Sequence, residues 1–248
     1  TRCTEIMSQP APATQAVTIP LGDLELAARL HRVAVAPRGA AVVAHGLYSS
    51  MQSAKLTRLG QALARAGWLT LRYDAMGCGQ SPGEVRLTTL NGRRDELLAA
   101  ATWLGRQAPG LPLAYLGSSL GGAAALLAAD LEPPQALICW STPIDMEELM
   151  LGMARRPQPP DLPAMARDMA QHDLEAVLAR ASRALFVHGE ADEVVPVSQA
   201  HRAYALAGEP KELLLLPGAD HRLTREADQD QAIARTLAWL EACAAPAA

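Results

Sequence analysis

Three side chains that could together perform nucleophilic catalysis occur along the chain in the order serine, acid, histidine. Ser119 is central to Gly117-Ser118-Ser119-Leu120-Gly121, a G-x-S-x-G pattern between an apolar run and an alanine-rich run. Asp192 and His221 each follow a later apolar run by a few residues. A serine hydroxyl needs a base to become a nucleophile, and a histidine base needs an acid to orient it. The order and placement predict a catalytic triad of Ser119, His221 and Asp192.

The glycines around Ser119 predict a tight turn from a strand into a helix. Small residues there let the backbone take a strained conformation that exposes the hydroxyl, and the helix N-terminus directs N–H groups at developing negative charge. An oxyanion needs two such donors. We expect them to be the backbone N–H groups of Leu120 and of Leu47, which lies in His45-Gly46-Leu47-Tyr48 after another apolar run.

Other residues compete for the two supporting roles. Asp145 also follows an apolar run and is the main rival to Asp192, which is itself flanked by Glu190 and Glu193. Of the remaining histidines, His45 and His188 adjoin turns that they are expected to shape by hydrogen bonding. His201 lies in a predicted helix, and His31 and His172 have no motif context.

The elements that must position these residues alternate between strands and helices. Two segments with alternating apolar residues, 17–20 and 24–30, predict an opening hairpin. Further strands are predicted at residues 40–44, 68–73, 113–116, 136–140, 184–188 and 212–216. Apolar residues at helical spacing lie between them, and helices are expected to begin near Pro196 and Thr224. This order predicts an α/β fold with a mostly parallel, doubly wound sheet and right-handed crossovers, in one domain over residues 1–248.

Residues 143–180 are too long for an ordinary connection and predict a short helical cap laid over the sheet. Two short helices are expected around a break at Pro157-Gln-Pro-Pro160. Met146, Met150 and Met153 would share one helical face, and Met165 and Met169 repeat the spacing. These methionines either pack the cap onto the sheet or overhang Ser119 beside Tyr48 as the wall of an acyl pocket.

Composition excludes several classes of function. The formal charge is −4 and the chain has no stripe of basic residues, so no nucleic-acid partner is predicted. Residues 107–129 carry no charge, but glycines and prolines divide them, so no membrane span is predicted. No signal peptide or CxxC pair is visible, which favours a reducing cytoplasm, although Cys3 and Cys243 could pair if the termini meet.

The sequence resembles the α/β-hydrolase superfamily across nearly the whole chain. The motifs that carry the resemblance are His45-Gly46, Asp74-x-x-Gly77-x-Gly79-x-Ser81, Gly117-x-Ser119-x-Gly121-Gly122, Asp192-x-Val194-Val195-Pro196 and His221. It is most similar to small bacterial carboxylesterases of the feruloyl/cinnamoyl-esterase type, grouped with the serine-aminopeptidase-like hydrolases. It departs from them at Ser118, where those enzymes commonly carry histidine, and in having no aromatic residue at 143–180. The resemblance implies the same triad and oxyanion pair.

We therefore expect a serine hydrolase that cleaves small to medium apolar acyl or aryl esters through an acyl-enzyme on Ser119, with no metal or organic cofactor. Tyr48, Met146, Met150 and Met153 are the expected substrate contacts, and a small-molecule ester is the expected partner. The same triad could serve a thioesterase, an amidase or peptidase, a carbon–carbon hydrolase or a perhydrolase. A binding protein that has lost turnover is the alternative from another class.

Overall fold

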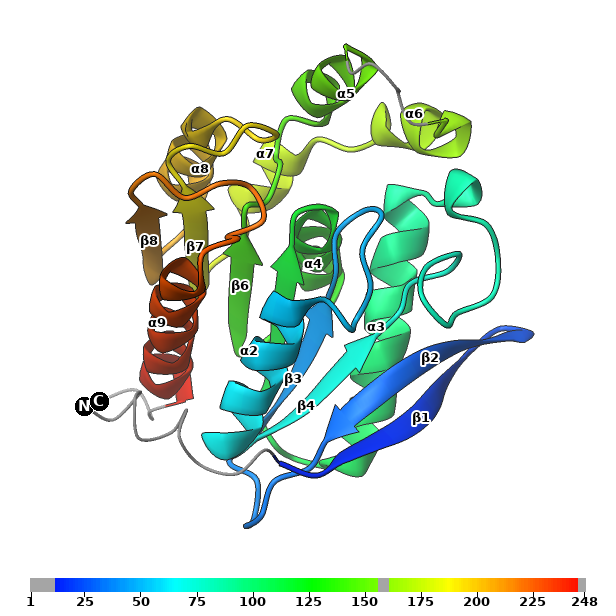
Figure 1. Cartoon of the computed structure of the whole chain (residues 1–248), viewed down its shortest axis with the longest axis vertical. Coiled ribbons are helices and arrows are strands. Elements are labelled where there is room, and N and C mark those ends of the chain that lie inside the picture. Colours follow the sequence, from blue (N-terminus) through cyan, green and yellow to red (C-terminus); the bar gives the residue numbers. More distant parts are fainter. Residues whose placement is uncertain (1–11, 156–160, 245–248) are drawn as a thin grey trace.

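A computed structural model describes residues 12–155 and 161–244, which form a sheet covered by helices on both faces (Figure 1). The strands are β1 (Thr14–Leu21), β2 (Leu24–His31), β3 (Gly39–Ala44), β4 (Trp68–Tyr73), β5 (Leu113–Ser118), β6 (Ala136–Trp140), β7 (Ala184–Gly189) and β8 (Lys211–Leu216). The helices are α2 (Ala54–Arg65), α3 (Leu90–Gln107), α4 (Leu120–Leu131), α5 (Met146–Ala154), α6 (Pro163–Met169), α7 (Leu174–Leu178), α8 (Val197–Leu206) and α9 (Glu226–Ala244), with a 3₁₀ turn, η1, at Val85–Leu87.

The sheet has the strand order β1-β2-β4-β3-β5-β6-β7-β8. Strand β2 pairs antiparallel with both β1 and β4, and every later pairing from β4 to β8 is parallel. The predicted mostly parallel, doubly wound sheet is confirmed. Its parallel strands end at one edge, and the loops that follow them are therefore gathered in one place.

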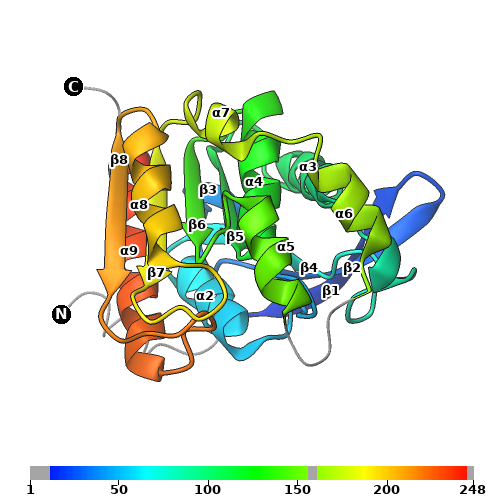
Figure 2. The same cartoon turned by 90° about the horizontal axis from the view of Figure 1, so that it is seen from above.

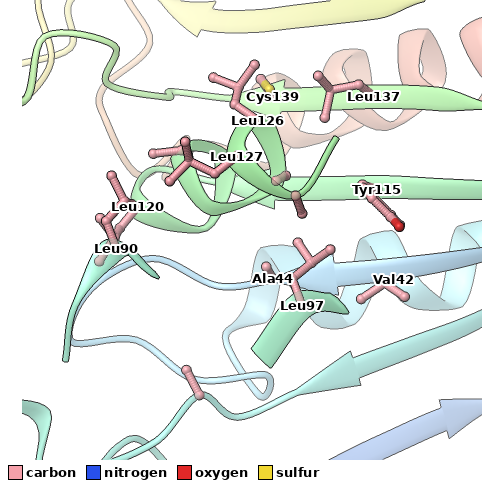
Figure 3. Close-up of a cluster of buried hydrophobic side chains, with 14 of the residues drawn as sticks. Val42, Ala44, Leu90, Leu97, Tyr115, Leu120, Leu126, Leu127, Leu137 and Cys139 are labelled. Atoms are coloured by element: carbon pink, nitrogen blue, oxygen red, sulfur yellow. The ribbon is translucent and has the colours of Figure 1, made fainter. Parts of the chain in front are cut away.

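Burial on both faces explains why the central strands are continuous apolar runs. Every residue of β3, β4, β6 and β7 is buried. One face packs against α2 and α9, and the other against α3, α4 and α8 (Figures 1 and 2). Figure 3 shows part of the second interface, where Leu97 of α3 and Leu126 of α4 lie among buried residues that include Val42 of β3 and Tyr115 of β5.

The insertion between β6 and β7 contains three short helices within the described residues, where the sequence predicted two. The expected pair corresponds to α5 and α6, and α7 was missed. The segment lies beyond the carboxyl ends of the strands (Figure 1). The predicted break at Pro157-Gln-Pro-Pro160 lies outside the described residues.

A buried carboxylate joins this insertion to the main body. Asp168 of α6 accepts hydrogen bonds from the backbone N–H groups of Leu90 and Asn91, at 2.7 and 3.1 Å, and from the side-chain amide of Asn91. These N–H groups open α3 and have no acceptor within that helix. Asp168 therefore supplies the acceptor for the first N–H groups of α3 and fixes α6 against that helix.

Two further sequence expectations concern the termini and membranes. Cys3 lies outside the described residues, so its pairing with Cys243 stays a prediction. In the part of the chain that the structure describes, no helix combines the length and the apolar character needed to cross a bilayer.

Candidate active site

Three loops at the carboxyl edge of the sheet carry the candidate residues. Ser119 follows β5 directly, Asp192 follows β7, and His221 follows β8. The loop after β3, residues 45–53, lies at the same edge (Figure 1). The parallel order of β3, β5, β6, β7 and β8 thus brings together residues that are far apart in the sequence.

Ser119 lies in a strained turn between β5 and α4. Its φ of 55° and ψ of −124° are unusual for a residue other than glycine. The flanking positions leave no room for a side chain, because a Cβ on Gly117 would collide with the carbonyl of Gly121, and a Cβ on Gly121 with that of Ala44. The G-x-S-x-G spacing is therefore a packing requirement of this turn, which directs the hydroxyl away from the sheet.

The structure brings Ser119, His221 and Asp192 into one hydrogen-bonded chain. The Ser119 hydroxyl lies 3.0 Å from Nε2 of His221, and Nδ1 of His221 lies 2.8 and 3.0 Å from the two carboxylate oxygens of Asp192. The Asp192 side chain is fully buried and that of His221 is 13% exposed. With Nδ1 donating to the carboxylate, the lone pair on Nε2 faces the serine hydroxyl, which is the arrangement a general base requires.

Several donors keep the Asp192 carboxylate ionised. Burial alone would raise its pKa, but hydrogen bonds from His188 and His221, with the backbone N–H of Val195, outweigh it and hold the pKa of Asp192 well below its usual range. The His188 Nε2 atom lies 3.2 Å from Asp192 and also donates to the carbonyl of Val195 at 2.9 Å. His188 thus shapes the loop after β7, as predicted, and in addition orients the acid, which was not predicted.

The expected oxyanion donors also lie at this edge. Leu120 opens α4, and Leu47 lies in the loop after β3. In the described part of the chain, neither of their backbone N–H groups has an intramolecular acceptor. Such free N–H groups beside a nucleophile can stabilise an oxyanion.

A buried histidine fixes the loop that carries Leu47. The backbone N–H of Ala75 donates to His45 Nε2 at 3.0 Å, so Nδ1 bears the proton and donates to the carbonyl of Gly46 at 2.7 Å. Burial and the nearby charge of Arg93 lower the pKa of His45, the Gly46 hydrogen bond raises it in part, and together these effects place it at about 3. His45 therefore stays neutral and holds this loop against the loop after β4.

The rival acids lie in other interactions. Asp145 is the N-cap of α5, where one carboxylate oxygen accepts the N–H of Glu148 at 2.8 Å and the other pairs with Arg202 at 3.2 Å. Glu190 is exposed, and Glu193 accepts the backbone N–H of His221 at 3.2 Å. Among these four carboxylates, Asp192 is the one that hydrogen-bonds to the imidazole of His221.

The remaining histidines lie away from Ser119. His31 accepts a hydrogen bond from Arg72 at 2.8 Å, His172 lies 3.5 Å from Asp168, and His201 is exposed on α8. In the described part of the chain, no group of three or more His, Cys, Asp or Glu side chains is arranged to hold a metal ion.

An apolar cavity of about 270 Å³, here called the methionine cavity, opens beside Ser119 and His221. Its walls include all five methionines of the insertion, which are Met146, Met150, Met153, Met165 and Met169, together with Leu47, Tyr48 and Leu120. Four of the five are buried in the core and Met150 is half-buried. The two sequence interpretations are thus not exclusive, because the same side chains pack the insertion and line a cavity at the serine.

Two charged residues that the sequence analysis did not single out also lie at the site. Lys55, in the first turn of α2, lines a second cavity that Ser119 shares, and Arg222, directly after His221, lines both cavities. Nothing in their local sequence marks them, since each reaches the site only through the packing of α2 and of the loop after β8.

Comparison with known proteins gives one family match. The model of the family described as serine aminopeptidase, S33, matches residues 35–171, which is more than half of the chain and includes Ser119. A relative from Mycobacterium tuberculosis strain H37Rv, itself uncharacterised, is 31% identical over 167 residues, or 66% of this chain. The match covers 56% of that relative, so the chain spans about half the length of the curated relative it matches.

Solved structures with the same fold cover nearly all of the chain. Est1E from Butyrivibrio proteoclasticus, solved with ferulic acid bound, has a TM-score of 0.81 at 22% identity, covering 91% of this chain and all of the other. An esterase domain from Rhodothermus marinus has a TM-score of 0.75 at 25% identity, covering 93% and 98%. The likeness to Est1E shows the fold alone.

Proposed function

We propose that this chain, which belongs to the serine aminopeptidase (S33) family of hydrolases and has the α/β-hydrolase fold, is a serine carboxylesterase for small to medium apolar acyl or aryl esters. The observation that carries the proposal is the chain of hydrogen bonds from Ser119 through His221 to Asp192, placed beside the methionine cavity. The esterase domain from Rhodothermus marinus supports an ester substrate by likeness.

The proposed reaction begins with the serine. The Ser119 oxygen attacks the ester carbonyl while His221 Nε2 takes the hydroxyl proton, and Asp192 stabilises the imidazolium that forms. The backbone N–H groups of Leu47 and Leu120 bind the oxyanion. When the C–O bond to the alcohol breaks, His221 returns the proton to the leaving oxygen. Water then attacks the acyl-serine, with His221 as its base, and releases the carboxylic acid.

The methionine cavity is the proposed acyl site. Met146, Met150 and Met153 contribute to its apolar lining together with the exposed residue Tyr48, and Glu193 and Arg222 are its charged lining residues. Methionine is unbranched and polarisable, so this wall can adapt to several acyl shapes and selects weakly among them. We propose that residues 143–180 act as a cap on a single domain, residues 1–248.

A matched substrate panel tests this proposal. Butyryl derivatives of one aromatic leaving group, as oxygen ester, thioester and amide, are compared by kcat/KM with the same enzyme preparation. We expect the oxygen ester to be cleaved and the amide to be at least about 100-fold slower, because resonance makes the amide carbonyl less electrophilic and the amine is a poorer leaving group than the phenol. Faster cleavage of the amide would assign the site to a peptidase, and faster cleavage of the thioester to a thioesterase.

A further inference from the structure

A second cavity meets the methionine cavity at Ser119, His221 and Arg222 and differs from it in being lined by Lys55. It measures about 360 Å³ and is formed by the loop after β3, the first turn of α2 and the segment after His221. Its polar lining includes Ser49, Ser53 and Lys55. The proposed esterase mechanism uses the methionine cavity for the acyl group and leaves this second one, here called the cationic cavity, without a role.

Two cations line the cationic cavity without partners of their own. In the described part of the chain, neither the Lys55 ammonium nor the Arg222 guanidinium forms a hydrogen bond or an ion pair within 4 Å. The carboxylates that face Lys55 are held by other groups, because Asp220 accepts two hydrogen bonds from Thr224 and Asp192 accepts those of two histidines. The half-buried Lys55 thus keeps its hydrogen-bond donors for a bound group, and the exposed Arg222 adds positive charge where the two cavities meet.

The half-buried position of Lys55 lowers the pKa of its ammonium group. Burial lowers the pKa of Lys55, whereas Asp220 and Asp192 oppose the decrease and Arg222 adds to it, and together these effects place the pKa at about 8. The ammonium therefore remains mostly protonated at neutral pH and has lost much of its water shell. An interaction between charges is stronger in such a site than at an open surface.

The N-terminus of α2 adds further donors. The N-cap residue Ser53 makes no capping hydrogen bond, and its hydroxyl is buried without a partner. The first N–H groups of a helix have no acceptor inside it and carry partial positive charge. The wall of the cationic cavity thus combines Lys55 with a helix N-terminus whose N-cap side chain supplies no hydrogen bond, in a chain whose net charge is −4.

We propose that the cationic cavity binds a carboxylate or phosphate carried by the leaving group of the ester, so that the preferred substrates join an apolar acyl group to an anionic alcohol or phenol. This inference rests on the proposed esterase function. Leu120, one of the two expected oxyanion donors, lines only the methionine cavity, whereas Leu47 lines both, and we assign the acyl group to the methionine cavity and the leaving group to the other. The products are an apolar acid and the anionic alcohol, with water as the only co-reactant.

Two esters that differ in one charge test the inference. 4-(Butanoyloxy)benzoate and 4-(butanoyloxy)benzamide share the acyl group and the ring, and the amide substituent withdraws more electrons, so chemistry alone favours the amide. We expect the wild-type protein to cleave the carboxylate with a kcat/KM about tenfold higher. The ratio of the two values cancels any difference in the amount of folded enzyme.

Lys55→Met removes the charge and keeps a good helix former, and we expect the ratio to fall about tenfold. Lys55→Arg should retain most of the preference. Lys211→Met is the matched control, because Lys211 is the only other lysine, lies at the start of β8 and stacks on Tyr204 instead of lining the cavity. It removes the same charge from the chain and should leave both rates unchanged. Added salt should reduce the wild-type ratio.

The outcomes separate the two proposals. If both esters are cleaved with a ratio that Lys55→Met does not change, the anion site is wrong and the esterase function stands. If neither ester is cleaved, the esterase function is wrong, and the anion site is then tested by measuring ligand binding. Ligand-observed NMR titration then compares 4-hydroxybenzoate with 4-hydroxybenzamide. Tighter binding of the carboxylate that is lost in Lys55→Met supports the site, and equal affinities overturn it.

Discussion

Ser118 and Ser119 are neighbours in the sequence, so substituting each in turn tests which of them is the nucleophile. Ser118 is the buried last residue of β5, whereas the Ser119 hydroxyl lies 3.0 Å from His221 Nε2. We expect Ser119→Ala to abolish labelling by a fluorophosphonate probe and to lower kcat by about 10⁴-fold or more, because the members of a triad act as a unit. Labelling followed by gel fluorescence, with kcat on a butyrate ester, measures both effects.

Ser118→Ala is the matched control for that experiment. It removes an equal hydroxyl from the neighbouring residue, and we expect labelling and most of the turnover to persist. The reverse result, with Ser118 essential and Ser119 dispensable, would mean that the turn presents the other serine.

The two rival carboxylates allow a second test on single residues. Asp192→Asn should preserve the fold and lower kcat by about 10⁴-fold, because an amide that donates to Nδ1 holds His221 in the wrong tautomer. Asp145→Asn should have a small effect, since asparagine also caps a helix and the Asp145 carboxylate interacts with α5 and Arg202 and not with His221. Steady-state kinetics on both variants, with circular dichroism as the check on folding, decide between them.

Residue roles could be predicted from the sequence where strand ends mark them. Ser119 and His221 each follow an apolar run directly or by a few residues, and the carboxyl edge of a parallel sheet gathers such residues. Lys55 and His188 show the limit of this reasoning. Lys55 reaches the second cavity only through the packing of α2, and His188 reaches Asp192 only through the fold of the loop after β7. Neither placement leaves a local pattern.

At the scale of an element, helix α5 allows a test of whether its methionines line the acyl site. Met150 is half-buried and lines the methionine cavity, whereas the next residue, Leu151, is 52% exposed and lies outside that cavity. We expect Met150→Trp to fill part of the cavity, which lowers kcat/KM for hexanoyl and octanoyl esters by at least about tenfold and spares acetyl esters. Rates along an acetyl-to-octanoyl series of p-nitrophenyl esters measure the shift.

Leu151→Trp is the control, because it adds the same ring to the same helix on its exposed side. Its chain-length profile should match that of the wild type. If Met150→Trp loses stability while its acyl profile stays unchanged, the methionines only pack the insertion and the acyl group binds elsewhere.

Elements were predictable in proportion to their burial and length. The strands β4 and β6 match their predicted bounds, because strands buried on both faces are continuous apolar runs with polar or turn residues at their ends. Helix α7 has five residues, too few to show a helical period. Its N-cap, Asp173, which accepts the N–H of Ala176 at 3.0 Å, is the one local signal that could have revealed it. The bond from Asp168 to α3 depends on tertiary contact and leaves no such signal.

Two buried histidines tie the stability of the whole molecule to pH. Burial, with the charge of Arg72, lowers the pKa of His31 to about 4, and burial lowers that of His45 to about 3. An unfolded histidine titrates near about 6.5. As the pH falls below that value, these two histidines become protonated in the unfolded chain but stay neutral in the folded protein. The free energy of unfolding therefore decreases. The decrease ends only below the folded pKa values.

We therefore expect the free energy of unfolding to fall steeply between pH 7.5 and pH 5, by about 2 kcal/mol for each of these histidines. The low pKa of Asp192 acts in the same direction, but below the unfolded aspartate pKa of about 4 and so outside this window. Urea unfolding at the two pH values measures the loss. His31→Gln should reduce it by about 2 kcal/mol, because glutamine can still accept the Arg72 hydrogen bond but does not titrate. His201→Gln, on the exposed side of α8, should leave the loss unchanged. An equal loss in His31→Gln and wild type would mean that His31 is protonated in the folded protein.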